Sequence, residues 1–238
     1  MSRLLLIRHA QASFLSENYD QLSARGETQA RLLGEYWARH KTSFQRAACG
    51  PAVRHIQTAQ LAAAACRSGG VSFPEPAILP EFDEFQGEAV LGATLPQLCA
   101  KNPEIRQLND LFRASTDAEK HASFQRLFQQ VISMWVNEEV SAPDIESWSD
   151  FAARVQRGLT RFLASSTRSE FAVIFTSGGP IAIAVQRALH ISNRDTLQIA
   201  WMARNCSFTE FLFSRDRFTL SSFNALPHLD DEALLTYR

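Results

Sequence analysis

The sequence predicts an α/β fold, in which helices enclose a mostly parallel β-sheet, and three observations support this class. Two runs of consecutive apolar residues, at 4–7 and 171–175, are typical of strands buried on both faces. Strand-like and helical segments alternate over the first seventy residues, as in α/β proteins. The chain closes with two runs of alternating polarity, at 206–213 and 217–224, which predict a C-terminal hairpin.

The predicted elements of the first third follow one another in regular alternation. After the strand at 4–7, Ser23 is a suitable N-cap for a helix that ends near residue 40, because apolar residues recur there at three and four positions. A short strand at 44–49 and a second helix at about 53–67 come next. This order predicts one strand–helix–strand–helix unit.

The middle of the chain is predicted to be helical. Residues 90–144 contain few strand-forming segments, and their apolar stripe at 124–135 indicates a helix face packed on a core. A further helix is expected at about 149–164, before the buried strand at 171–175. The next helix begins near Pro180, a residue that suits the first turn of a helix.

Composition limits the classes of protein to which the chain can belong. Its 238 residues suffice for one domain, or for one domain with a lid. A formal net charge of −1, without a dense Lys/Arg run, argues against nucleic acid or an anionic membrane as the main partner. The four cysteines lack disulfide or metal spacing, and residues 1–9 lack a signal-peptide pattern. These features predict a cytoplasmic protein with reduced thiols.

Arg8 and His9 directly follow the first buried strand, where ligands usually bind at the edge of an α/β sheet. Histidine can act as a nucleophile, and the guanidinium fork matches the oxygens of a phosphate. A purely structural pair is the alternative when these two residues are considered alone.

Two further segments have features of an anion site. Arg54 lies in the first turn of the helix at 53–67, where the helix dipole already favours an anion, although an exposed surface arginine is the alternative. Gly178 and Gly179 connect the strand at 171–175 to the next helix, so their backbone N–H groups can approach an anion.

Taken in order, these motifs resemble the histidine phosphatase superfamily, which includes the cofactor-dependent phosphoglycerate mutases and many phosphomonoesterases. The resemblance rests on Arg8-His9, on LSARGETQA at 22–30, and on Arg54 with QTA at 57–59. It extends to Asn205 and to the tail at 223–229, and therefore covers nearly the whole chain. It implies a three-layer α/β/α sandwich, formed by residues 1–238 as a single domain with a helical insertion at about 90–144 over the active site.

The resemblance also implies a role for each matching residue. His9 would become phosphorylated, while Arg8, Arg54 and Gly178 would bind the phosphoryl group, without a metal or another cofactor. Glu81, in the motif LPE at 79–81, would be the general acid, which requires a carboxyl group kept partly protonated. For Glu84, a role in the site and a place on an acidic surface loop are both open.

Ser177 is the largest departure, because the family has its second catalytic histidine at this position. A serine keeps a hydrogen-bond donor but no charge, so we expect slow turnover and expect Ser177→His to increase it. His228 or Glu84 could compensate, although His228 is otherwise an ordinary surface histidine. Ser177 could also be a simple N-cap; a nucleophilic serine is disfavoured, because Phe175 stands where that motif has glycine.

The function that the resemblance implies is hydrolysis of a small phosphate ester through a phosphohistidine. A phosphatase is favoured over a mutase because ASFL at 12–15 lacks the tryptophan- and asparagine-rich pattern of the mutases. The alternative is a protein that binds phosphate esters with little turnover. The sequence leaves the substrate and the oligomeric state open, with a homodimer as one alternative.

Overall fold

The computed structural model describes residues 1–13, 20–142, 144–167 and 169–237. Two compact units are present, one made of Met1–Glu84 with Arg154–Arg238 and the other of Phe85–Ala153. The motif at 12–15, on which the preference for a phosphatase rests, lies partly outside the described residues.

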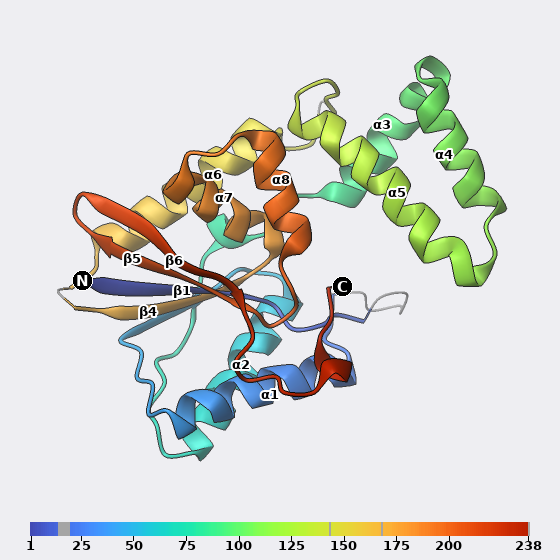
Figure 1. Ribbon diagram of the computed structural model, residues 1–238. Coiled ribbons are helices and arrows are strands. Elements are labelled where there is room, and N and C mark those ends of the chain that lie inside the picture. The colour runs from blue at the N-terminus through green and yellow to red at the C-terminus, as the bar shows by residue number, and fades with distance from the viewer. Residues whose placement is uncertain (14–19, 143, 168, 238) are drawn as a thin grey trace. The chain divides into compact units, whose positions relative to one another are not determined.

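The first unit is built on a six-stranded sheet with the order β3-β2-β4-β1-β5-β6 (Figure 1). The strands are β1 (Ser2–Arg8), β2 (Arg46–Cys49), β3 (Ala77–Ile78), β4 (Phe171–Thr176), β5 (Phe208–Ser214) and β6 (Arg217–Ala225). The first four run parallel to one another, whereas β5 pairs antiparallel with β1, and β6 pairs antiparallel with β5. The predicted fold class, a mostly parallel sheet with a C-terminal hairpin, is therefore confirmed.

The two apolar runs form the central pair of strands, as predicted. In β1, Leu4, Leu6 and Ile7 are fully buried, and β4 pairs alongside it in parallel. The pairing aligns Arg8 with Thr176, so that both strands end at the same edge of the sheet. The motifs at 8–9 and 176–179 are therefore neighbours in space.

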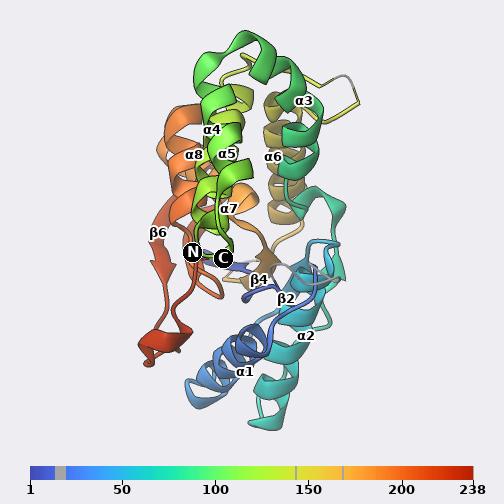
Figure 2. The same ribbon diagram turned by 90° about the vertical axis from the view of Figure 1, so that its right-hand side faces the viewer.

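Helices cover both faces of this sheet (Figures 1 and 2). One face carries α1 (Ala24–Arg39) and α2 (Val53–Ser68), and the other carries α7 (Gly178–Leu189), α8 (Asn193–Met202) and the later part of α6 (Trp148–Ala164). Ser23 caps α1 as predicted, because its Oγ accepts a hydrogen bond from the Gly26 N–H at 3.0 Å. Trp37 of α1 fills the core beneath the sheet and packs edge-on against Phe175.

The described residues of the second unit form three complete helices, α3 (Gly87–Lys101), α4 (Pro103–Ala114) and α5 (Asp117–Val136). The predicted helical character of this segment is confirmed. Caps divide the segment into separate helices. The Asn102 side chain caps α4, and Thr116 with Glu119 forms a capping box on α5. Its core is aromatic, with Trp135 and Trp148 packed edge-on at 5.6 Å between ring centroids.

Several elements differ from the prediction. The two-residue strand β3, the helix α8, and the short 3-10 helices η1 (Pro80–Phe82) and η2 (Glu232–Leu234) carry too little periodicity to be predicted. The strand predicted at 206–213 begins only at Phe208, because Cys206 adopts a left-handed backbone with φ of 60°. That conformation turns the Cys206 N–H toward the main-chain oxygens of Arg8 and His9.

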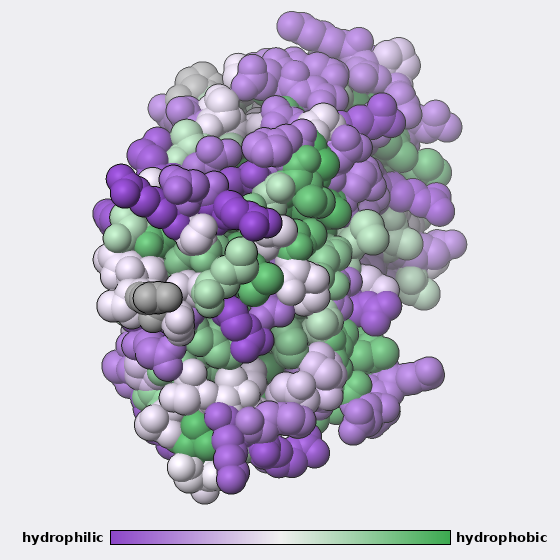
Figure 3. All heavy atoms as spheres, turned by 60° about the vertical axis from the view of Figure 1, so that its left-hand side comes forward, coloured by the Kyte–Doolittle hydropathy of each residue, from purple (hydrophilic) through white to green (hydrophobic). Residues whose placement is uncertain are grey.

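Among the residues that the structure describes, large exposed apolar side chains do not concentrate in one segment. Those exposed among the described residues are scattered along the chain: Met1, Val53, Ile78, Leu111, Leu189, Met202 and Tyr237. On the face shown in Figure 3, hydrophobic residues lie among hydrophilic ones, as is usual for protein surfaces. Within the described ranges, every helix is too short or too polar to cross a membrane.

Candidate active site

His9 lies at the end of β1, directly beside the end of β4. Its N–H donates to the Thr176 carbonyl at 2.7 Å, and Nδ1 lies 2.8 Å from the carbonyl oxygen of Ala10. Because a carbonyl only accepts, Nδ1 carries the hydrogen of the neutral ring, and Nε2 keeps its lone pair. The ring is thus held in the tautomer that a nucleophile requires.

The surroundings of His9 keep it uncharged. Its side chain is buried, and burial lowers its pKa well below the ordinary value; the nearby charges of Arg54 and Arg8 lower the pKa further. A positive field that disfavours a protonated imidazole also favours an anion beside it. The two arginines predicted to bind phosphate thus both act on His9.

Arg8 is held by the C-terminal part of the chain. Its Nη1 donates to the carbonyl oxygen of Ala203 and, at 2.7 Å, to that of Tyr237. Asn205 also contributes there, donating from Nδ2 to the His9 carbonyl at 3.2 Å. The resemblance noted for Asn205 therefore corresponds to a scaffolding contact with the motif at 8–9.

Arg54 lies in the first turn of α2 and pairs with Asp20, a residue that no motif of the sequence marks. Asp20 Oδ1 lies 2.5 Å from Arg54 Nη1, and Oδ2 accepts from the Val53 N–H at 2.7 Å. The carboxylate thus occupies the helix N-terminus, a position that favours anions. It supplies the negative charge that a bound phosphate would otherwise bring.

The QTA motif at 57–59 fixes backbone near the site. Thr58 Oγ1 accepts from the Ala10 N–H at 3.0 Å, and Gln57 Oε1 accepts from the Leu22 N–H at 2.9 Å. These bonds tie α2 to the segments that follow β1. The motif therefore contributes to the geometry around His9 through main-chain contacts.

Ser177 contacts a second histidine, His55, which the sequence analysis did not identify. Ser177 Oγ lies 2.6 Å from His55 Nε2, and both residues are buried. The ring of His55 lies 5.7 Å from that of His9, centroid to centroid. Burial and the charge of Arg54 hold the pKa of His55 well below its ordinary value. The only feature of the sequence that could have pointed to His55 as a site residue is its position next to Arg54.

Gly50 makes room for His55. A Cβ atom at this position would lie 2.4 Å from His55 Nδ1 and 2.5 Å from the carbonyl oxygen of Phe82. Only a residue without a side chain fits there. The missing side chain of Gly50 therefore leaves room for the second imidazole.

Gly178 packs closely against α8, since a Cβ there would lie 2.8 Å from the carbonyl oxygen of Ala200. The next residue, Gly179, donates its N–H to Glu84 Oε2 at 3.1 Å. The carboxylate of Glu84 therefore lies at the start of α7, next to Ser177. The sequence left open whether Glu84 belongs to the site or to an acidic surface loop. In the structure its carboxylate lies at this turn.

Glu81 is directed toward α6. Its Oε1 pairs with Arg161, and its Cβ lies so close to Gly158 that a side chain there would overlap it. The main-chain oxygens of Pro80, Glu81 and Asp83 all accept from Arg154 Nη1, at 3.1, 3.1 and 3.2 Å. The loop of the predicted general acid is thus fixed to α6, while Glu84 is the carboxylate that reaches the Ser177 turn.

His228 lies in a different environment from the one expected of a surface histidine. It is only 3% exposed, and its ring packs on Phe208 and Tyr36. Its hydrogen-bonding nitrogens lack a partner among the described residues, and no ring contact joins it to His9 there. Burial lowers its pKa to about 3.

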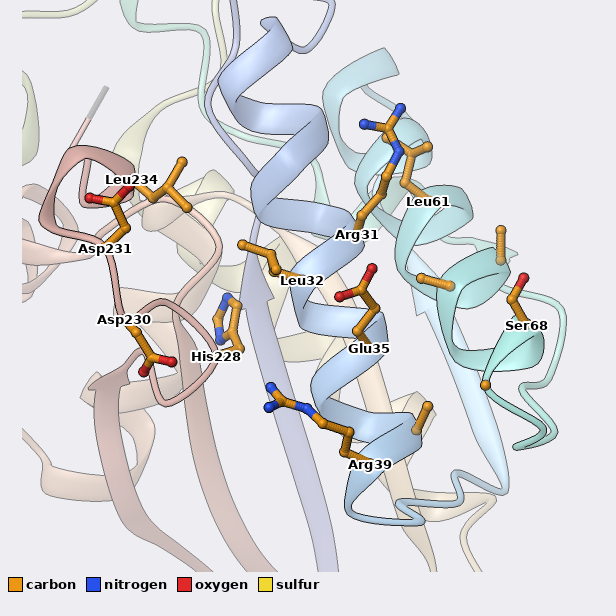
Figure 4. Close-up of a pocket in the computed structure, with 14 residues that line it drawn as sticks. Arg31, Leu32, Glu35, Arg39, Leu61, Ser68, His228, Asp230, Asp231 and Leu234 are labelled. Carbon is orange, nitrogen blue, oxygen red and sulfur yellow. The ribbon is translucent and has the colours of Figure 1, made fainter.

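A groove of about 1000 Å³ runs beside His228, along α1 and α2 (Figure 4). Charged side chains of both signs line it, among them Arg31, Glu35, Arg39, Asp230 and Asp231. The groove includes none of Arg8, His9 and Arg54, so its size does not mark the candidate active site. Within the described ranges, no three His, Cys, Asp or Glu side chains lie close enough together to hold a metal ion.

Comparison with protein families gives one match. The family model described as histidine phosphatase superfamily (branch 1) matches residues 4–137 and 112–226. Among curated proteins, no sequence matches the chain.

Solved structures with the same fold include three that illustrate its range. A putative alpha-ribazole-5'-P phosphatase from Escherichia coli has a TM-score of 0.64 and 18% identity, covering 94% of this chain and 96% of its own. A phosphoglycerate mutase from Bacillus anthracis has a TM-score of 0.64 and 17% identity, covering 95% and 94%. A mycobacterial glucosyl-3-phosphoglycerate phosphatase has a TM-score of 0.61 and 21% identity, covering 96% and 100%. At these identities the likeness concerns the fold alone.

Proposed function

This chain belongs to the histidine phosphatase superfamily, and from that premise we propose that it hydrolyses a small phosphate ester through a phosphohistidine on His9. The observation that carries the proposal is the state of His9 itself. Its Nδ1 is bound to the Ala10 carbonyl, so Nε2 has a free lone pair on a neutral ring within the field of two arginines. A neutral imidazole held in this way is a competent nucleophile.

The proposed reaction has two steps. His9 Nε2 attacks phosphorus, the N–P bond forms, and the P–O bond to the leaving alkoxide breaks while a carboxylic acid gives that oxygen its proton. Water then attacks the phosphohistidine, the same carboxylate takes a proton from the water, and the N–P bond breaks to release inorganic phosphate. Arg8 and Arg54 offset the charge on the phosphoryl oxygens during both steps.

We assign the proton transfer to Glu84. Glu81 is the residue that the family resemblance indicates; its Oε1 is paired with Arg161, and its Oε2 is buried without a hydrogen-bond partner among the described residues. Glu84 instead accepts from the Gly179 N–H, in the turn that carries Ser177 and Gly178. This placement favours Glu84 as the acid.

The substrate we propose is a small-molecule phosphate ester, because the net charge of −1 and the absence of a basic run do not favour nucleic acid. Two of the structural neighbours are phosphatases of small esters, alpha-ribazole-5'-P and glucosyl-3-phosphoglycerate, which is consistent with this class. Turnover is expected to be slow, since Ser177 supplies no positive charge to the phosphoryl group.

A protein that binds phosphate esters without turnover is the second candidate, favoured by Ser177 alone. Trapping the intermediate separates the two. We expect that mixing the protein with ³²P-labelled aryl phosphate, followed by rapid quenching, gives a base-stable, acid-labile label that is absent in His9→Ala. A protein that binds vanadate but never acquires this label is the binding protein, and the proposed function is then rejected.

A further inference from the structure

The hydrogen bond between His55 and Ser177 joins the start of α2 to the turn between β4 and α7. At 2.6 Å between Nε2 and Oγ it is short, and both side chains are excluded from solvent. Ser177 stands where the family resemblance places a catalytic imidazole. The structure therefore brings the imidazole of His55, from α2, to Ser177, the residue that stands in place of the family's second histidine.

The position of the hydrogen atom in this bond follows from burial. Nδ1 of His55 is buried, and no described residue hydrogen-bonds to it. A buried N–H without a partner is rarer and more costly than a buried acceptor, and the lowered pKa of His55 leaves its ring with one hydrogen. That hydrogen therefore lies on Nε2, which donates to Ser177 Oγ.

The hydroxyl hydrogen of Ser177 is then directed elsewhere. Ser177 makes no side-chain capping bond to α7, and its Oγ has no other hydrogen bond within the described ranges. A hydroxyl that accepts a bond becomes a stronger donor, because successive hydrogen bonds polarise one another. The ring of His9 lies 5.7 Å from that of His55, and the His9 N–H is bonded to the carbonyl oxygen of Thr176, the residue before Ser177, so the turn that carries this donor lies next to His9.

We propose that His55 and Ser177 together replace the missing imidazole: Ser177 donates to an oxygen of the transferring phosphoryl group, and His55 orients and polarises that hydroxyl. This inference rests on the proposed function and deepens it. Ser177 is the catalytic residue in contact with substrate, and His55 is a positioning residue that acts through it. Gly50 belongs to the same device, because its missing side chain leaves space for His55 Nδ1.

The same pair could also be read as a serine nucleophile with its base, but two features oppose this. A base must accept the serine hydrogen on Nε2, whereas burial places a hydrogen there. The Nδ1 atom of a catalytic base is normally oriented by a carboxylate, and His55 has no such partner among the described residues. A serine nucleophile would leave an acid-stable phosphoserine, so the trapping experiment distinguishes the two.

The test compares kcat and KM for hydrolysis of p-nitrophenyl phosphate in five variants. They are Ser177→Ala, His55→Leu, the double variant, His55→Gln and His55→Asn. Each single removal is expected to lower kcat about a hundredfold with KM changed less than threefold, as for loss of one preorganised donor. The double variant is expected to be no slower than the slower single variant, because both act through one hydroxyl.

The amide pair separates positioning from packing. Glutamine can place an N–H where His55 Nε2 lies, whereas the shorter asparagine reaches only the position of Nδ1. We therefore expect His55→Gln to recover at least tenfold in kcat over His55→Leu, and His55→Asn to recover nothing. Thermal denaturation of every variant checks folding, and His40→Gln, which alters an exposed histidine at the end of α1, serves as the control with unchanged kcat.

A related comparison uses the space that His55 occupies. An imidazole at position 177 would overlap His55, since Oγ is already 2.6 Å from Nε2. Ser177→His alone is therefore expected to lose activity, contrary to the expectation from sequence, and Ser177→His combined with His55→Ala should regain at least tenfold.

Two outcomes reject the inference. One is a double variant whose loss equals the product of the two single losses, and the other is equal kcat in His55→Gln and His55→Leu. The labelling experiment keeps this separate from failure of the proposed function. If wild-type protein forms phosphohistidine while the variants behave in either of these ways, only the role of His55 is wrong; if it forms none, the proposed function is wrong.

Discussion

Glu81 and Arg161 form an ion pair, with 2.5 Å between the carboxylate Oε1 and the guanidinium Nη2. The arginine is largely exposed, so the pair contributes little to stability, about 0–1 kcal/mol. The main effect of the pair is on where the Glu81 carboxylate points, because it holds that carboxylate against α6. The proton donor proposed for the leaving group is consequently Glu84.

The first prediction distinguishes Glu84 from Glu81 as the proton donor, by comparing kcat for substrates whose leaving groups do and do not need a proton. Glu84→Gln should lower kcat for an alkyl phosphate by about a hundredfold or more, the usual contribution of a general acid. The same variant should lose much less with p-nitrophenyl phosphate, whose leaving group needs no proton. Glu81→Gln should change both substrates by similar, small factors. A steeper dependence on the leaving group in Glu81→Gln than in Glu84→Gln would return the role to Glu81.

The second prediction concerns the carboxylate at the start of α2. Asp20 binds Arg54 and the Val53 N–H, and would compete with a phosphate for both groups. Asp20→Asn should therefore tighten inhibition by orthophosphate several-fold. The measurement is the inhibition constant at fixed ionic strength. Glu27→Gln, which removes a charge from an exposed pair on α1, is the matched control and should leave that constant unchanged. Weaker inhibition in Asp20→Asn would mean that Asp20 orients Arg54 rather than competing for it.

The third prediction is acid sensitivity through His228. Its folded-state pKa of about 3 lies below that of an unfolded histidine, about 6.5. The unfolded chain therefore binds more protons, and the stability from this residue is complete above about pH 6.5 and lost as pH falls toward 3. Because pH 4.5 lies about two units below the unfolded pKa, His228→Phe should reduce the difference in unfolding free energy between pH 7.5 and pH 4.5 by about 2.7 kcal/mol, at 1.36 kcal/mol per pH unit.

Urea denaturation at the two pH values provides this measurement. His121→Gln, at an exposed position on α5, is the control and should leave the difference as in the wild type. An unchanged difference in His228→Phe would show that the groove admits protons to His228 in the folded state.

The fourth prediction concerns the glycine beside His55. Gly50→Ala should destabilise the protein by about 1–3 kcal/mol and lower kcat, because the new methyl group would displace His55 or the Phe82 carbonyl. Gly92→Ala is the matched control: open space surrounds that position in α3, and alanine there should stabilise by about 0.5–1 kcal/mol. Chemical denaturation and kcat of both variants check this, and equal stabilities would mean that the site can relax.

The central elements of this fold can be predicted because their signals are local. The apolar runs of β1 and β4 and the cap at Ser23 follow from neighbouring residues. The strand β3 could not be predicted, because two residues carry no periodicity. The left-handed turn at Cys206 is imposed by the main-chain oxygens of Arg8 and His9, which are distant in sequence.

The candidate site divides in the same way. Arg8, His9 and Arg54 are marked by their places at the ends of predicted elements. The contact of His55 with Ser177 joins residues 122 positions apart, and it depends on how α2 packs beside β4. The side-chain directions of Glu81 and Glu84 are set by contacts with α6 and α7, which no pattern within the loop at 79–85 specifies.

Arg154 connects the two points at which the chain leaves the sheet-bearing unit and returns to it. The chain leaves the sheet-bearing unit after Glu84 and returns to it at Arg154, whose guanidinium binds the main chain at 80–83. Exit and return therefore lie side by side, fixed by one side chain. An excursion with adjacent ends can be lengthened, trimmed or exchanged at little entropic cost, about 0.6 kcal/mol per doubling in length. The segment Phe85–Ala153 can therefore change in length while the main chain at 80–83 keeps its place beside α6.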